Sequence, residues 1–436
     1  MKVLIIAKWF APMNIIGAVR PYNFADGLHK LDAKVTVVTS ELEPNKEELD
    51  FNYSVVRVPY GKIEAWNKGR IQAGKTSSTT VASSSNTTPQ KRTRLVAFLR
   101  RIAAQVLTVA EAFEWSGIAF KKCCEIIKQD KPDLILTTYG PIDTVLVGLK
   151  LKSKFSKIKW VADIRDALDA QQQQSWRRKI YIMIQRKMVK KSDAMITVCS
   201  ALTEKYSSLA KKHNRNVPVY TIVNGFEDGT ATEKPENDGI LRIGYTGSLY
   251  GGLRKMDAIF EALSEIEKET GATAPVKVCY AGPGGEEFIG QAKAYGAEKY
   301  AENFGMLDRK SALSLQEKSD ILCVVSWNTK KEKGILTGKF PEYLRLKKPV
   351  LALISGDVAG AELTERIDEL KVGFSYEYVN KSTDFIKFIV WLKKAIHAKK
   401  ENKNVCPDIK LNLIEEYSYK NLSKQLFETL ESIVSK

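Results

Sequence analysis

Short hydrophobic runs alternate along this chain with amphipathic stretches of helical period. Stretches such as 20–31 and 175–192 repeat their apolar positions every three to four residues. The hydrophobic runs of the first half are 2–10, 34–40, 53–60, 132–139, 158–164, 193–199 and 217–223. Strands that alternate with helices predict βαβ units, and therefore an α/β fold whose parallel sheet is covered on both faces.

The same alternation restarts in the second half of the chain. Its hydrophobic runs are 241–247, 276–282, 320–327 and 349–355. Residues 226–239 are rich in Gly, Asp, Glu and Pro and are typical of a linker. We therefore expect an N-terminal domain over 1–225, a C-terminal domain over 240–410 and a helix over 411–436. This helix either stays with the second domain or crosses back to the first. A length of 436 residues also favours more than one hydrophobic core.

One insertion interrupts the first half. Residues 72–92, QAGKTSSTTVASSSNTTPQKR, contain too few apolar side chains to order themselves and predict a mobile loop. The segment 94–109 follows, with apolar side chains on one helical face and arginines outside it. It is either a helix packed on the sheet edge or a helix lying in a membrane interface. Its apolar positions are Leu95, Phe98, Leu99, Ile102, Val106 and Val109.

The excess of positive over negative charge is confined to the first half. The net charge is +17, and the first 225 residues hold 37 of the 68 Lys and Arg but only 19 of the 51 Asp and Glu. A basic half beside a neutral half predicts a surface that meets an anionic partner, such as lipid headgroups, a phosphorylated acceptor or nucleic acid.

Hydrophobicity and cysteine usage bear on the compartment. No stretch reaches the roughly 18 unbroken apolar residues of a spanning helix, and the start MKVLIIAKWFAP does not have the pattern of a signal peptide. The six cysteines form no CxxC pair, which favours reduced, structural thiols. We expect a cytoplasmic protein, which is either free in the cytoplasm or attached through its basic surface to the inner face of the plasma membrane.

Two loops are candidates for ligand binding, because open α/β sheets bind ligands beyond the carboxyl ends of their strands. Gly17 precedes a helix after the first strand, where it would let another molecule approach the backbone. After 241–247 come three glycines, including Gly247, and then Arg254 and Lys255. Backbone amides beside cations suit a diphosphate. Neither loop contains GxGxxG or GxxxxGK[ST], so neither a dinucleotide cofactor nor a P-loop is supported.

A second cationic position lies in TGKFPEYL, before the strand 349–355. Lys339 and Glu342 are three residues apart and would share a helical face. If the helix opens at Thr337 or Gly338, its free N–H groups point the same way and suit a phosphate. The alternative is an ordinary amphipathic helix with a surface Lys–Glu pair.

These motifs together resemble glycosyltransferase family four. YTGSLYGGLRKMDAIFEAL, YAGPG and TGKFPEYLRLKKPVLAL resemble its donor-binding half, whereas FAPMNIIGAVRPYNFADGL and KWVADIRDAL resemble its acceptor half. The resemblance covers nearly the whole chain and fails only around 60–125. It implies the GT-B architecture of two facing Rossmann-like domains with parallel sheets and an inter-domain cleft.

The resemblance also implies roles for single residues. Lys339 would lie by the donor diphosphate, and Glu342 would bond the ribose hydroxyls. Gly17, Gly247, Ser248, Lys255 and Gly338 would complete the donor site. The family often has a second glutamate where this chain has Gly334, and an arginine where it has Ser248, which leaves Arg254 or Lys255 for the second phosphate contact.

The motif Asp163-Ile164-Arg165-Asp166 resembles that of bacterial cell-envelope polysaccharide transferases. Arg165, Asp166, Arg254 and Lys339 are therefore the expected catalytic residues. Asp166 would orient the acceptor hydroxyl or steady the sugar cation, or it would merely cap a helix or pair with Arg165.

The implied reaction moves a sugar from a nucleotide sugar to a saccharide or lipid-linked acceptor with retention of configuration. The sequence has no DxD motif, so we expect no metal site and no cofactor. The alternatives are a GT-B sugar-nucleotide epimerase and a basic nucleic-acid-binding protein. The chain has only three histidines and an ordered donor half, which disfavours both, and we expect no nucleic-acid partner.

Overall fold

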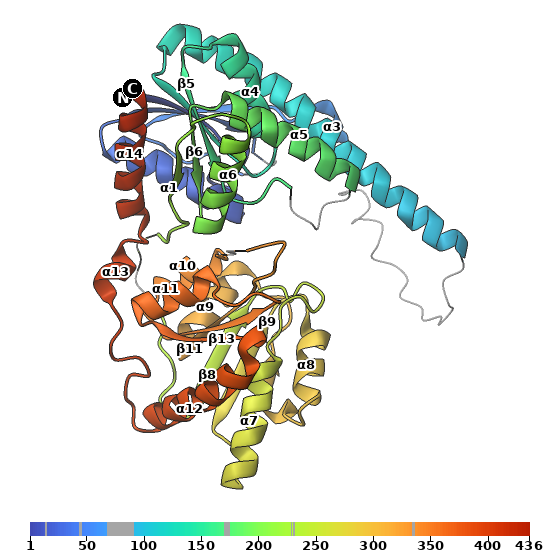
Figure 1. The fold of residues 1–436 in the computed structure, drawn as a ribbon, viewed down its shortest axis with the longest axis vertical. Coiled ribbons are helices and arrows are strands. Elements are labelled where there is room, and N and C mark those ends of the chain that lie inside the picture. Colours follow the sequence, from blue (N-terminus) through green and yellow to red (C-terminus); the bar gives the residue numbers. More distant parts are fainter. Residues whose placement is uncertain are drawn as a thin grey trace. The chain divides into compact units, whose positions relative to one another are not determined.

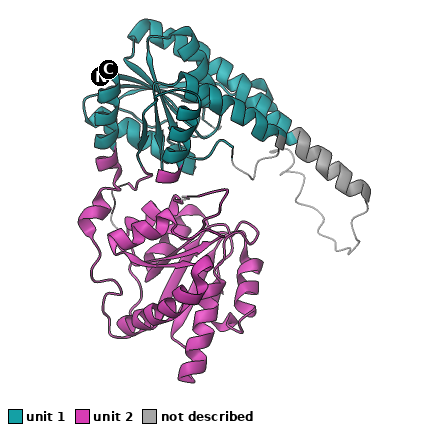
Figure 2. Ribbon diagram, viewed as in Figure 1, with its two compact units in different colours: residues 1–198, 202–222, 423–436 teal, residues 199–201, 223–422 magenta. Residues whose placement is uncertain are grey.

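The computed structural model divides the chain into two compact units (Figure 2). Unit 1 holds residues 1–198, 202–222 and 423–436, and unit 2 holds 199–201 and 223–422. The structure describes residues 1–13, 15–42, 46–67, 91–169, 175–227, 229, 232–333 and 336–436, without the side chains of 91–103 and 175. The C-terminal segment thus belongs with the first unit, although the chain reaches it from the second.

Unit 1 is built on a sheet of seven parallel strands in the order β3-β2-β1-β4-β5-β6-β7. The strands are β1 (Lys2–Ile6), β2 (Lys34–Ser40), β3 (Ser54–Val58), β4 (Leu134–Thr138), β5 (Lys159–Ile164), β6 (Ala194–Thr197) and β7 (Val219–Thr221). The direction of winding reverses at β1, which pairs with β2 on one side and β4 on the other. The carboxyl ends of β1 and β4 therefore flank the position where such sheets bind ligands.

Helices cover both faces of this sheet (Figure 1). The helices of unit 1 are α1 (Ile16–Lys30), α3 (Lys91–Asp130), α4 (Asp143–Lys154), α5 (Ser175–Lys191), α6 (Ser200–Lys212) and α14 (Tyr419–Val434). Because side chains alternate along a strand, Leu4 and Ile6 join the core beneath α3 to α6, whereas Val3 and Ile5 point to the opposite face. There α1 and α14 meet closely, since a Cβ on Gly27 would lie 2.1 Å from the Ser423 hydroxyl oxygen.

Unit 2 repeats the design with six parallel strands in the order β10-β9-β8-β11-β12-β13. The strands are β8 (Leu241–Thr246), β9 (Val276–Ala281), β10 (Ala301–Asn303), β11 (Ile321–Trp327), β12 (Val350–Ser355) and β13 (Gly373–Glu377). Here β8 lies between β9 and β11, so its carboxyl end marks the reversal of winding.

The helices of unit 2 bury alternate residues of the same strands. They are α7 (Asp257–Thr270), α8 (Gly285–Lys293), α9 (Arg309–Lys318), α10 (Lys339–Leu344), α11 (Glu362–Leu370), α12 (Lys381–Lys400) and α13 (Leu411–Glu415). Along β11, Cys323 and Val325 pack with α7, α8 and α12, whereas Leu322 and Val324 pack with α10, α11 and α13. Two faces are therefore covered, as the apolar strand runs predicted.

The predicted amphipathic stretches 20–31 and 175–192 are α1 and α5. The segment 94–109 lies within α3, which continues to Asp130. On its predicted apolar face Val106 is 52% exposed and Val109 is half-buried, while the four earlier side chains lie outside the described residues. Residues 72–90 of the predicted loop also lie outside them, whereas Lys91 and Arg92 open α3.

The cysteines and the hydropathy of the helices match the expectations from the sequence. All six cysteines are buried and unpaired, so none forms a disulfide. Among the described helices, none combines the length and hydropathy required to cross a bilayer.

Candidate functional site

The chain leaves the carboxyl end of β8 through Gly247. The Gly247 N–H donates to the Ala281 carbonyl (2.8 Å), and the Gly247 carbonyl accepts from the Tyr280 hydroxyl (3.0 Å). A Cβ on Gly282 would lie 2.0 Å from the Gly247 oxygen, so no side chain fits there. The glycine-rich loop after β8 is therefore held against the end of β9, backbone to backbone.

Arg254 follows this loop and lies between two aromatic rings. Its guanidinium carbon is 4.5 Å from the ring centre of Tyr250 and 5.2 Å from that of Trp327. Its Nη1 makes only long hydrogen bonds of 3.4 Å, to the Tyr245 hydroxyl and the Ser248 carbonyl. Its Nε is buried without a hydrogen-bond partner among the described residues. The rings orient the cation, which keeps donor capacity for an anionic ligand.

Lys339 and Glu342 lie on one face of α10, which begins directly after Gly338. The Lys339 Nζ is 3.2 Å from Glu342 Oε1, and the same oxygen accepts from Gln316 Nε2 (2.7 Å). Gln316 Nε2 also donates to the Thr246 hydroxyl (2.8 Å), at the end of β8. The pair is partly solvated, with side chains 33% and 22% exposed, so it contributes little stability and stays accessible to a ligand.

Most of the predicted donor residues of unit 2 thus meet at one sheet edge, and two of them, Ser248 and Lys255, point elsewhere. Ser248 folds back on the loop, where its Oγ accepts from the Tyr250 N–H (3.1 Å). Lys255 is exposed and projects over the ring of Tyr378, 5.9 Å from its centre. Thr337, just before Gly338, has a buried hydroxyl without a partner among the described residues. This hydroxyl is a further unsatisfied group beside α10.

Gly334, the position at which the family resemblance breaks, lies outside the described residues. The nearest upstream carboxylate is Glu332, whose Oε2 accepts from the Trp327 indole N–H (3.0 Å). This bond places a carboxylate at the end of β11, beside the ring that contacts Arg254.

In unit 1, Arg165 connects three loops at the carboxyl edge of the sheet. Its guanidinium donates to the carbonyls of Tyr139 (2.7 Å), Gly17 (2.8 Å) and Gly140 (3.2 Å). These bonds make Arg165 a positioning residue in this structure, and its predicted catalytic role stays a prediction. A Cβ on Gly17 would lie 2.3 Å from the Trp9 ring, and this contact accounts for the glycine without a ligand.

Asp163 forms a buried ion pair with Arg20 of α1. Arg20 donates from Nη2 (2.8 Å) and Nε (3.0 Å) to the two oxygens of the carboxylate, and Thr138 donates a third bond (2.8 Å). Nη2 of Arg20 also donates to the Ile222 carbonyl (2.9 Å). Only 2–3% of either side chain is exposed, so this pair fixes the end of β5 and does not face solvent.

Asp166 differs from the other polar residues of its motif because it is exposed. It has no hydrogen bond or ion pair with the described residues, and the next helix begins only at Ser175, so neither predicted structural role is seen. Protein atoms around the carboxylate raise its pKa by desolvation, which the nearby Arg165 partly opposes.

A buried lysine at the same edge, which pairs with two carboxylates, was not predicted from the sequence. Lys8, just beyond β1, is 2.7 Å from Asp143 and 2.9 Å from Glu64, and its Nζ lies 5.5 Å from the centre of the Trp115 ring. Burial alone would lower the pKa of Lys8, but the two carboxylates outweigh it and raise the pKa. The only hint in the sequence was a lysine that follows an apolar run.

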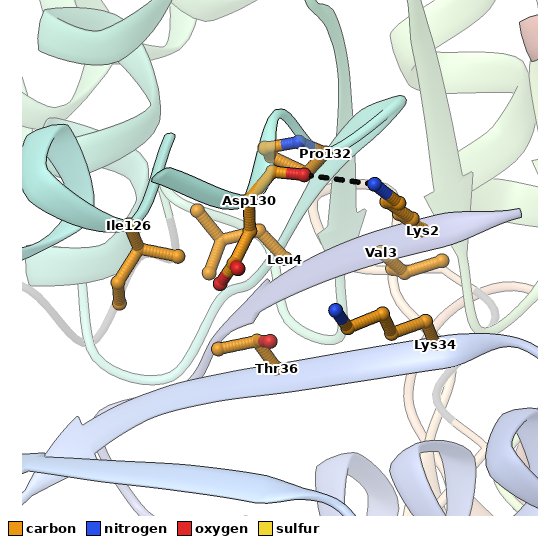
Figure 3. Close-up of a pocket in the computed structure, with 8 residues that line it drawn as sticks. All are labelled: Lys2, Val3, Leu4, Lys34, Thr36, Ile126, Asp130 and Pro132. Atoms are coloured by element: carbon orange, nitrogen blue, oxygen red, sulfur yellow. Dashed lines mark hydrogen bonds between the residues drawn. The ribbon is translucent and has the colours of Figure 1, made fainter. Parts of the chain in front are cut away.

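A shallow hollow lies at the opposite, amino edge of the sheet (Figure 3). It is lined by Lys2, Val3, Leu4, Lys34, Thr36, Ile126, Asp130 and Pro132, and Lys2 Nζ donates across it to the Asp130 carbonyl (3.2 Å). Ligands of such sheets bind at the other edge, so this hollow is not a candidate site. Within the described ranges, no three His, Cys, Asp or Glu side chains gather in a way that could hold a metal ion.

Comparisons with known proteins bear on the family and the fold. Residues 17–221 match the family described as "Glycosyl transferase 4-like domain", which confirms the family resemblance in the first half. No curated protein matches the chain significantly.

Solved structures resemble the whole chain. Sucrose-phosphate synthase from Thermosynechococcus elongatus is 12% identical with a TM-score of 0.64, covering 100% of this chain and 99% of that one. The lipopolysaccharide outer core galactosyltransferase WaaB is 12% identical with a TM-score of 0.55, covering 99% of both chains. A putative UDP-N-acetylglucosamine 2-epimerase from Listeria monocytogenes is 14% identical with a TM-score of 0.50, covering 99% and 96%. At these identities the likeness shows the fold, which is of the GT-B type.

Proposed function

From the premise that residues 17–221 form a glycosyl transferase 4-like domain, we propose that the protein is a glycosyltransferase. It moves a sugar from a nucleotide-diphosphate donor to a saccharide or lipid-linked acceptor, with retention of configuration and without a metal ion. The observation that carries this proposal is the bonded chain from Thr246 through Gln316 to Glu342 and Lys339. It holds a cation and a carboxylate at the strand end that such folds use for ligands.

The proposed chemistry follows from the charges that develop in the reaction. When the bond between the sugar and the diphosphate breaks, the sugar becomes cationic and the leaving diphosphate gains negative charge. Lys339 and Arg254 stabilise the leaving group with fixed positive charge. The acceptor oxygen bonds to the sugar carbon, and its proton passes to the leaving phosphate oxygen. Glu342 has one oxygen with only a weak internal bond (3.4 Å, to Lys339) and can accept from the ribose hydroxyls.

We further propose a role in cell-envelope polysaccharide synthesis at the inner face of the plasma membrane. The support is the motif around Asp166, the basic first half of the chain, and the presence of WaaB among the proteins of similar fold. The epimerase alternative has weaker support, because the three histidines lie at or just after the ends of α1, α6 and α12, away from the carboxyl edges of the two sheets.

Binding of a nucleoside diphosphate without a divalent ion tests the donor site. Titration calorimetry with UDP, GDP and dTDP is expected to show binding of at least one of them, with an affinity unchanged by EDTA. The reason is that the phosphate contacts are proposed to come from Lys339, Arg254 and backbone amides. Binding that disappears on chelation would contradict the metal-free part of the proposal.

Asp166→Asn should lower turnover by about 100-fold without lowering stability. A raised folded-state pKa means that the carboxyl binds its proton more tightly when folded, so its contribution to stability is greatest at acid pH and is lost as pH rises through that pKa. At neutral pH the folded protein bears the desolvation cost of the ionised Asp166 carboxylate. Asparagine is uncharged and removes that cost, so the stability stays equal or rises.

The pH profile of kcat/KM provides the second readout for Asp166. If the ionised carboxylate acts on the acceptor or the sugar cation, activity should fall as pH drops through the raised pKa, which lies above the ordinary 3.8. The asparagine variant should lack this acid limb. Wild-type activity in Asp166→Asn would exclude the proposed role.

A further inference from the structure

One exposed face of α5 carries six basic side chains and one apolar side chain. Exposed positions recur along the helix every three to four residues, so they form a single face. We call this face the α5 stripe; it consists of Arg178, Lys179, Met183, Arg186, Lys187, Lys190 and Lys191. The stripe spans fourteen residues, which correspond to about 20 Å of helix. The opposite face packs into the core through buried residues such as Tyr181, Ile184 and Met188.

The charges of the stripe have no ion-pair partner in the part of the chain that the structure describes. None of its six basic residues forms an ion pair with a described residue. Arg178 and Lys191 donate hydrogen bonds only to neutral oxygens, those of the Asp169 carbonyl and the Ser153 hydroxyl. The helix contains no acidic residue. Six unpaired cations on one face are unfavourable for an isolated surface, and they favour an anionic partner.

The positive potential of the stripe also acts on a neighbouring side chain, His213. His213, just after α6, has a lowered pKa because of desolvation and because Lys190, Arg186 and Lys212 lie near it. The nearest acid in sequence, Asp193, is already bonded to Lys152 and to the Trp160 N–H, both at 2.7 Å. The positive potential therefore extends from the end of α5 to the end of α6.

The composition of the stripe favours a lipid surface over a nucleic acid. Its centre is Met183, an apolar side chain that is 47% exposed. The stripe has no aromatic ring on which a base could stack. Helix α3, which covers the same face of the sheet, also exposes apolar side chains, Val106 and Phe113. A basic helix face with an apolar centre is typical of helices that lie on membranes.

We propose that the α5 stripe is a docking surface for anionic lipid headgroups. It would bring unit 1 to the bilayer that carries a lipid-linked acceptor, and this purpose rests on the proposed function. We assign the principal contact to the stripe and not to the apolar face of 94–109, because the charges of the stripe are exposed and form no ion pair with a described residue.

Vesicle sedimentation tests the stripe directly. The full-length protein is mixed with vesicles of phosphatidylcholine alone or with 30 mol% phosphatidylglycerol, at low and high salt. We expect binding only to the anionic vesicles and a loss of binding at high salt. The variant Arg186→Gln, Lys187→Gln, Lys190→Gln should bind on the order of 100-fold more weakly, since each charge near an anionic leaflet contributes about fivefold.

A matched control removes the same charge elsewhere. Lys387, Lys394 and Lys400 of α12 are exposed and unpaired among the described residues, so their change to Gln should leave vesicle binding intact. Met183→Gln keeps every charge but should weaken binding to vesicles, and it should not change the retention of random DNA in a gel shift. Equal loss of vesicle binding in both triple variants would overturn the proposal and would indicate a response to net charge alone.

The outcomes separate this inference from the proposed function. If the wild-type protein ignores anionic vesicles but cleaves a nucleotide sugar, the docking surface is wrong and the proposed function stands. If it binds vesicles through the stripe but cleaves no nucleotide sugar, the docking surface stands and the proposed function is wrong. If the stripe variant loses DNA binding and keeps vesicle binding, the surface serves nucleic acid and the lipid proposal fails.

Discussion

Lys339→Ala should lower turnover by about 100- to 1,000-fold, the cost expected for removing one fixed charge or donor from a developing anion. The Lys339 side chain is one-third exposed at the sheet edge, and among the described residues it forms an ion pair with Glu342 alone. Its loss therefore leaves the leaving diphosphate with Arg254 as the remaining oriented cation. Folding should be little affected, because a partly solvated pair at i,i+3 contributes well under about 1 kcal/mol.

Steady-state kinetics with the cleaved donor measures this effect, and two variants calibrate it. Lys347→Ala removes an exposed lysine near the end of the same segment, which pairs only with surface Glu415, and should leave kcat unchanged. Glu342→Gln should chiefly raise the KM for the donor, since it would weaken the proposed contact to the ribose. If Lys339→Ala keeps near-wild-type kcat, the assignment of the phosphate site is wrong.

Arg20→Met should destabilise unit 1 by about 3 to 5 kcal/mol. The methionine matches the length of the arginine stem but leaves the Asp163 carboxylate buried with the Thr138 hydroxyl as its main remaining donor. The substitution also removes the hydrogen bond to the carbonyl of Ile222. Ile222 is the last residue of unit 1 before the chain enters unit 2. An uncompensated buried charge is the costliest of these losses.

Thermal and urea unfolding, followed by a signal from unit 1, measure the change for Arg20→Met. The double variant Arg20→Met, Asp163→Asn removes the orphaned charge and should recover part of the lost stability. A double variant that is less stable than Arg20→Met alone would contradict the account, because it would mean that the charge itself is not the source of the cost.

The strands with apolar runs could be predicted from the sequence, and the two edge strands of unit 2 could not. Strand β10 consists of Ala301–Asn303 and lies at the sheet edge, so neither length nor hydrophobicity marks it. Strand β13, Gly373–Glu377, mixes glycine and polar residues, because it also lies at an edge and is only partly buried. Local periodicity reports burial, and these two edge strands have too few buried apolar residues to show it.

The candidate site divides in a similar way. The spacing of Lys339 and Glu342 placed both on one helical face, and the structure has them 3.2 Å apart. Gln316, which connects Glu342 to the end of β8, is 26 residues from Glu342 and has no local signal. The stacking of Arg254 on Trp327 likewise joins positions far apart in sequence. Periodicity reaches a few residues, whereas these contacts depend on how strands are ordered in the sheet.

The motif Asp163-Ile164-Arg165-Asp166 shows a different limit of the sequence. Its three polar residues are equivalent as letters, but the fold gives them separate environments. Asp163 is buried against Arg20, Arg165 donates to three carbonyls, and Asp166 is exposed. Only the tertiary structure distinguishes the carboxylate that is available to a substrate from the one that fixes the strand end.

The central claim, that this protein transfers a sugar from a nucleotide donor, is tested most directly by donor cleavage. The purified protein is incubated with a panel of UDP-, GDP-, dTDP- and ADP-sugars, with and without an acceptor extract of saccharides and lipids, and the released nucleoside diphosphate is measured. We predict release from at least one donor by the wild-type chain and a 100- to 1,000-fold slower release by Lys339→Ala. Absence of release from every donor by the folded protein, with the acceptor extract present, would contradict the account.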